Sequence, residues 1–169
     1  MQEQQTFLAD EFFSMTLMAT VQRGRLYREG SSEDSREAFR RALRSRLERL
    51  REQYAAGVSE DQHLANIENL ANELSGSDAL KERRFRIGSA QKALNLYLKY
   101  MWCSGRVATP PHCPFDSVVL SRLPSCRNVR WTQLDSLDAY KQLVQEARKA
   151  AGGNSLAEWE LRLYNDAQP

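Results

Sequence analysis

The sequence has no apolar run of the about 18 residues that a membrane-spanning helix needs, and it carries little net charge. Its 24 lysines and arginines face 22 aspartates and glutamates, which leaves a formal charge of +2. Overall charge therefore does not call for a polyanionic partner, and any nucleic-acid binding has to depend on where basic residues cluster. The first residues, MQEQQTFLADEFF, lack a basic segment followed by an apolar one. We therefore expect a cytoplasmic protein with no secretory signal and no membrane contact.

Cysteine is scarce as well. The three cysteines are Cys103, Cys113 and Cys126, with His112 directly beside the second of them. Structural zinc sites usually offer two pairs of ligands, each pair roughly two to four residues apart, and these spacings do not match. In a cytoplasmic protein the cysteines are expected to be reduced, partly buried thiols. We therefore expect neither a metal nor another cofactor.

The sequence also lacks alternating strand patterns, internal repeats and low-complexity tracts. Apolar residues recur instead at helical spacing, and short polar segments separate these stretches. We expect one all-α domain over residues 1–169, a compact bundle of about seven helices. The expected helices cover about 6–22, 33–54, 59–74, a short segment from 79, 89–103, the residues after Asp116, 137–151, and a last segment from 155.

Two of these segments have unusual compositions. Residues 6–22 are apolar on most of their circumference, which predicts a core helix, with lining of a pocket for an aromatic ligand as the alternative. Residues 33–54 are rich in arginine, with glutamates interspersed, which favours a solvated face with helix-spaced ion pairs over phosphate binding. The expected N-caps are Ser32 or Ser35, Ser59, Asp135 or Ser136, and Ser155.

Most of the candidate chemistry lies in residues 83–123. Arg83, Arg84 and Arg86 precede Gly88 and Ser89, with an apolar helix following. A glycine turn followed by helix N-terminal amides, with arginines nearby, is a favourable phosphate site. The simpler interpretation is an interhelical turn with solvated arginines.

Polar residues interrupt the helix expected over 89–103. Lys92, Asn95 and Lys99 follow at i, i+3 and i+7 and so form one stripe. The stripe either meets water or lines a polar cleft, and the pattern alone favours water. Asp116 follows a proline-bearing loop and precedes an apolar helix, which is an N-cap position. A rigid carboxylate at such a position can both cap the helix and take part in chemistry.

The order of these features resembles the helix-hairpin-helix DNA glycosylase superfamily. The matching segments are IGSAQKALNLYLKYMW and PFDSVVLSRL, both within residues 83–123. The chain departs from the family in having one glycine where the hairpin usually has two, in placing Lys92 four residues after Gly88, and in its longer loop. It also lacks the four-cysteine cluster of the iron–sulfur members.

The resemblance implies a DNA glycosylase that excises a damaged or modified base. It could act in repair, or, as a separate hypothesis suggested by the small size of the chain and its departures from the family pattern, on modified phage DNA. Asp116 would stabilise the sugar cation and Lys92 would attack C1′ to form a Schiff base, with Lys99 as the alternative amine. The implied partner is DNA, bound by a monomer. The phosphate-binding residues would be Arg83, Arg84, Arg86, Gly88 and Ser89, and the base pocket would use Asn95, Tyr97, Trp102, His112 and Phe115.

Two non-enzymatic functions are alternatives to the glycosylase. The same arginines, with those of residues 33–54, fit a module that binds DNA or RNA without catalysis. A protein-interaction module is the other alternative, and the low net charge favours it. The arrangement of Lys92 and Asp116 favours the enzyme.

Overall fold

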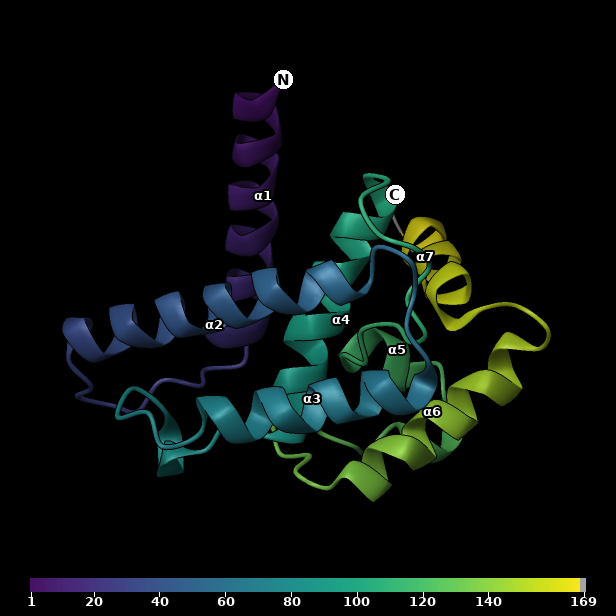
Figure 1. Cartoon of the computed structure of the whole chain (residues 1–169). Helices are drawn as coiled ribbons and strands as arrows, with labels where there is room; N and C mark the ends of the chain where they lie inside the picture. The colour runs from purple at the N-terminus through teal and green to yellow at the C-terminus, as the bar shows by residue number, and fades with distance from the viewer. Residues whose placement is uncertain (168–169) are drawn as a thin grey trace.

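A computed structural model describes residues 1–167, and these residues are helical with no β-strand (Figure 1). This confirms the expected all-α fold of about seven helices. Short π and 3₁₀ segments join the α-helices at Met18–Gln22, Lys81–Arg83 and Pro124–Cys126. The α-helices are α1 (Gln2–Leu17), α2 (Glu33–Gln53), α3 (Glu60–Leu74), α4 (Ile87–Cys103), α5 (Ser117–Ser121), α6 (Leu137–Ala151) and α7 (Leu156–Asp166).

Helix α4 is the centre of the fold. Every residue from Ile87 to Leu98 is buried, and the helix contacts α1, α2, α3 and α6. Figure 1 shows it between these helices, passing behind α2 and α3. A helix that is apolar on most of its circumference is stable only when other elements cover it on several sides, so its sequence accounts for this position. The buried residues around it form one contiguous core.

Side-chain oxygens cap five of the helices. Each accepts a hydrogen bond from a backbone amide two or three residues later, which satisfies a donor that the helix leaves free. The caps predicted at Ser59 and Ser155 are confirmed, and at the two ambiguous positions the structure uses Ser32 and Ser136. Asp135 is not an N-cap; its Oδ1 accepts from the Ile87 amide at the start of α4, at 3.1 Å.

Helix α1 differs from the prediction. It projects from the body of the protein (Figure 1), and Phe7, Leu8, Met15 and Met18 are exposed. The expectation of a core helix over 6–22 is wrong for the start of this segment, whereas Phe13 and Val21 belong to the core. Periodicity identifies apolar positions without showing what covers them. None of the helices in residues 1–167 is long and apolar enough to cross a membrane.

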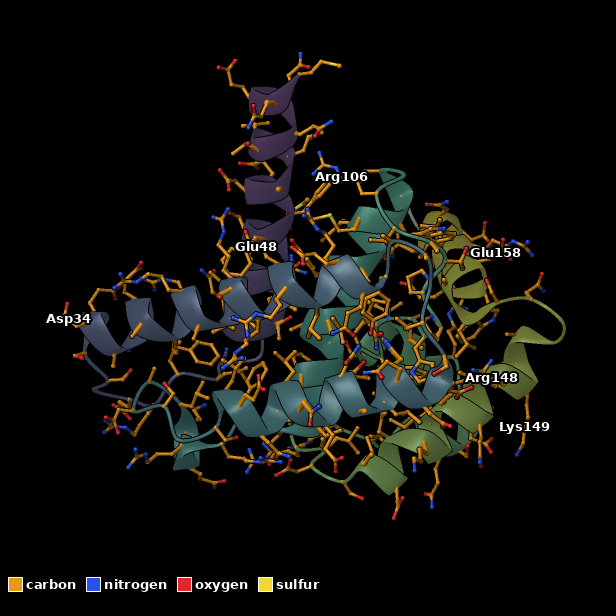
Figure 2. All side chains as sticks on the ribbon, in the orientation of Figure 1. Asp34, Glu48, Arg106, Arg148, Lys149 and Glu158 are labelled. Carbon is orange, nitrogen blue, oxygen red and sulfur yellow. The ribbon has the colours of Figure 1, made fainter. Side chains whose placement is uncertain are left out.

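Helix α1 contacts the body of the protein at several points along its length. Phe13 and Thr16 are buried, and Arg44 of α2 pairs with Asp10. Arg106, labelled beside α1 in Figure 2, donates from its guanidinium to the Gln5 carbonyl at 3.2 and 3.3 Å. The π-helical segment that follows then leads the chain back to the core.

Gly88 lies within the first turn of α4 and not in a turn ahead of it. Its amide donates to the Leu134 carbonyl at 2.7 Å, and a Cβ at this position would lie 1.7 Å from the Trp131 carbonyl oxygen. Glycine is therefore required here because the backbone of residues 131–134 packs directly against the helix. The predicted role of Gly88, a tight turn, was wrong.

Candidate functional site

Lys92 and Asp116 meet beside α4, although they are 24 positions apart in the sequence. Asp116 is the N-cap of α5, and its Oδ1 accepts hydrogen bonds from the Val118 and Val119 amides, both at 3.1 Å. Its Oδ2 lies 3.2 Å from Lys92 Nζ. One oxygen therefore holds the helix start while the other is bound to the amine.

The amine of Lys92 is more enclosed than its partner. The Lys92 side chain is 9% exposed and that of Asp116 27%, so the pair reaches the surface through the carboxylate. Burial lowers the pKa of Lys92 below its ordinary value; Asp116 opposes this shift and Arg23 adds to it. Such an amine loses its proton more readily than an exposed lysine, and the neutral amine is the nucleophilic form.

Gln91 fixes the loop that carries Asp116. Its side-chain Nε2 donates to the Phe115 carbonyl at 2.8 Å, and its Oε1 accepts from the Phe115 amide at 3.1 Å. The residue before Lys92 thus holds the residue before Asp116, which fixes the distance between amine and carboxylate. Our sequence analysis missed Gln91, and only its position beside Lys92 could have indicated this role.

A buried hydrogen-bond network lies next to this clamp. The Tyr54 hydroxyl accepts from Asn66 Nδ2 at 3.0 Å, so it donates to His63 Nδ1 at 2.6 Å. His63 Nε2 then carries the proton and donates to Asn95 Oδ1 at 2.8 Å. Asn95 Nδ2 donates in turn to Gln91 Oε1 at 3.2 Å and to the Tyr140 hydroxyl at 3.1 Å.

The hydrogen-bond network continues from Tyr140 to Glu60 at the surface, with each group donating to the next. Having accepted from Asn95, the Tyr140 hydroxyl donates to His112 Nδ1 at 2.8 Å. His112 Nε2 donates to Glu60 Oε1 at 3.2 Å, and Arg148 of α6 (labelled in Figure 2) pairs with the other oxygen of that carboxylate at 2.8 Å. Asn95 Oδ1 and Glu60 Oε1 can only accept, so Nε2 of each histidine donates, which assigns a neutral Nε2–H tautomer to both histidines.

We expect the protein to lose stability as the pH falls below the ordinary histidine pKa. Burial lowers the pKa of His63 and of His112 to about 3, whereas an unfolded histidine titrates near 6.5. The unfolded chain therefore binds more protons below pH 6.5, so the stabilisation is complete above that pH and declines as the pH falls toward 3. Two such groups lower the free energy of unfolding by about 3 kcal/mol between pH 7.5 and 5.5.

Urea unfolding at several pH values measures this decline. His112→Gln, which removes one titrating group, should lose about half of the pH dependence in that range. A flat stability profile from pH 7.5 to 5.5 in the wild type would contradict neutral, buried histidines.

The predicted phosphate-binding arginines are bound to acceptors of the protein itself. Arg83 donates to the Gly76 carbonyl at 2.7 Å, and Arg84 pairs with Asp135 at 2.9 Å. Arg86 pairs with Glu82 in the same segment. The first amide of α4, that of Ile87, already donates a hydrogen bond to the Asp135 carboxylate. Arg84 and Arg86 nevertheless line a small surface hollow, together with Gly24, Arg25, Leu26, Lys81, Ser89, Thr132 and Gln133.

Lys99 does not contact Asp116. Its Nζ lies 2.9 Å from both carboxylate oxygens of Glu160, and these side chains are 12% and 7% exposed. Burial raises the pKa of Glu160, and the nearby lysine opposes that rise. The stripe of Lys92, Asn95 and Lys99 is thus largely buried, and the prediction that it faces water was wrong. Of the two lysines, Lys92 is the one at the aspartate.

The residues predicted for a base pocket are packed inside the protein. Asn95, Tyr97, His112 and Phe115 are at most 1% exposed, and Trp102 is partly buried against the core. They therefore belong to the core or pack against it. The aromatic ring that lies at the amine is Trp131, whose centroid is 4.9 Å from Lys92 Nζ.

Comparisons with protein-family models, with curated proteins and with solved structures found no match to this chain. Within residues 1–167, no group of three or more histidine, cysteine, aspartate or glutamate side chains is placed to hold a metal ion. A function for this protein is therefore inferred from the chemistry of the site itself.

Proposed function

We propose that this protein is a DNA glycosylase in which Lys92 is the nucleophile and Asp116 stabilises the reacting sugar. The observation that carries the proposal is the 3.2 Å contact between a buried amine and the carboxylate that caps α5. Both residues lie in the segments that resemble the helix-hairpin-helix glycosylases, and their meeting is the feature on which that chemistry depends. Burial lowers the pKa of the amine, and hydrogen bonds from two backbone amides hold the carboxylate in place, so each group has the environment that its role requires.

The neutral amine of Lys92 attacks C1′ of the deoxyribose. The N–C1′ bond forms as the glycosidic bond breaks, and that electron pair leaves with the base, which takes up a proton. After the attack the nitrogen passes its extra proton to the departing base or to water. The nitrogen lone pair then forms the C1′=N bond as the C1′–O4′ bond breaks, and O4′ takes up a proton, which leaves a protonated Schiff base between Nζ and C1′. Loss of a C2′ proton and departure of the 3′-phosphate would cut the strand.

Asp116 supports the step in which the sugar becomes positively charged. Its carboxylate cannot turn away, because the Val118 and Val119 amides hold one oxygen and Gln91 holds the preceding residue. A fixed negative charge close to C1′ stabilises the cation-like transition state without further reorganisation. The same carboxylate attracts the protonated amine between turnovers.

Basic residues without partners extend from this site along the following loop. Between Asp116 and Asp135 the sequence has no acidic residue, and Arg122, Arg127 and Arg130 are all exposed. Within the described part of the chain, no carboxylate forms an ion pair with any of the three. Unpaired arginines in the segment that follows Asp116 suit a phosphate backbone, and we propose that they bind DNA together with the hollow at Arg84 and Arg86.

Base release tests the proposal. The wild-type protein is incubated with duplexes that carry oxidised, deaminated or alkylated bases and with phage DNA that carries modified bases, and free base is measured by mass spectrometry. The proposal expects release of at least one of these bases. Salt-sensitive DNA binding without base release from any substrate would favour the non-catalytic nucleic-acid module instead.

A further inference from the structure

We propose that Trp131 belongs to the active site as a positioning residue, whose ring covers the Lys92 amine and sets how readily that amine gives up its proton. This inference rests on the proposed function for its catalytic consequence. The contact itself, with the ring centroid 4.9 Å from Nζ, is independent of that function.

Trp131 packs closely against two glycines from different parts of the chain, Gly88 and Gly24. Its carbonyl oxygen lies where a Cβ of Gly88 would be, one helical turn before Lys92 on the same face of α4. The far edge of its ring, Cη2, lies 2.9 Å from the position of a Cβ on Gly24, at the end of the π-helical segment. Neither glycine has a positive φ, so close packing accounts for both. At Gly88 the nearest atoms belong to the Trp131 backbone, whereas at Gly24 the Thr20 carbonyl oxygen, 2.3 Å from the Cβ position, lies closer than the Trp131 ring.

The ring of Trp131 and the carboxylate of Asp116 both lie close to the amine. An aromatic face attracts a cation, so the ring stabilises the protonated amine while it also excludes water from it. The other charged groups that act on Lys92 are Arg23, which repels the cation, and Glu160 of α7, which attracts it. Exclusion of water is the largest of these influences, and it favours the neutral amine.

Trp131 is only partly buried, so part of this residue reaches the surface. It lies in the arginine-bearing loop between the 3₁₀ segment Pro124–Cys126 and α6. A DNA strand bound to that loop would press the ring onto the amine, which couples DNA binding to loss of water around the nucleophile. The ring is thus placed to act on Lys92 and through it on the substrate.

Titration of Lys92 tests the inference without DNA. The chain has five lysines, so the protein is labelled with ¹³C-lysine, and their Cε resonances are followed against pH and assigned with lysine-to-arginine variants. Trp131→Ala admits water and should raise the pKa of Lys92, whereas Trp131→Phe retains a ring face and should leave it close to the wild type. If Trp131→Ala does not fold, Trp131→Leu removes the ring while filling part of its volume.

Borohydride trapping provides the catalytic measurement. Each unit by which the pKa rises removes about tenfold of the neutral amine at pH 7, so Trp131→Ala should slow adduct formation at least about tenfold, with recovery at higher pH. A folded Trp131→Ala protein with an unchanged Lys92 titration would overturn the inference and leave the proposed function standing. A shifted titration without adduct in the wild type would support the contact and refute the glycosylase.

Discussion

Lys92→Met is expected to lower the yield of borohydride-trapped protein–DNA adduct by at least about 1,000-fold, the scale seen when a catalytic nucleophile is removed. Methionine keeps the length and the apolar stem of lysine but has no amine, so the Schiff base cannot form. Asp116 keeps the hydrogen bonds from the Val118 and Val119 amides and stays partly exposed, so the variant should stay folded. Gel analysis of adducts on a substrate that the wild type cleaves measures the effect.

Lys99→Met is the matched control. It removes an amine from the same helix, two turns away, and it leaves the Glu160 carboxylate in a buried site without its partner. We expect this variant to lose about 3 kcal/mol of stability but to keep its adduct yield at temperatures where it is folded. If folded Lys99→Met lost the adduct while Lys92→Met kept it, Lys99 would be the nucleophile and the proposed role of Lys92 would be contradicted.

Asn95→Ala is expected to cause the largest loss of stability among single substitutions in the buried network. Asn95 accepts from His63 and donates to Gln91 and Tyr140, so alanine leaves one buried donor and two buried acceptors with a lost partner. Each such group costs about 1–3 kcal/mol, and a total near 4 kcal/mol is a large part of the stability of an ordinary domain. Urea unfolding at pH 7.5 measures the change.

Asn69→Ala provides the comparison for this substitution. Asn69 is an exposed residue of α3, so its removal leaves no buried polar group and should change the free energy of unfolding by less than about 0.5 kcal/mol. Equal effects of Asn95→Ala and Asn69→Ala would mean that the network contributes little.

The sequence predicted the helices and several of their ends, because periodicity and caps are local signals. Asp116 was recognised as an N-cap from its neighbours alone, and the structure confirms it. Local signals could not show which helix lies beside which, so α1 was expected in the core although Phe7 and Met18 are exposed. The same limit explains why Lys99 and Lys92 could not be separated as candidate amines before their partners were known.

The site was only partly predictable for a related reason. Lys92 and Asp116 were named from a resemblance, but their contact depends on how Gln91 binds the loop before α5. Trp131 was missed because nothing within its own segment connects it to α4. The link is Gly88, which a sequence reader assigns to a turn, whereas the structure shows that it leaves space for the Trp131 backbone.

Peptide mapping of the trapped adduct tests the central claim most directly. The wild-type protein is reduced with borohydride in the presence of a cleaved substrate, digested, and analysed by mass spectrometry for the peptide that carries the sugar remnant. Our account predicts the remnant on Nζ of Lys92. A remnant on Lys99 or on the N-terminal amine, or base release with no adduct at all, would contradict Lys92 as the nucleophile.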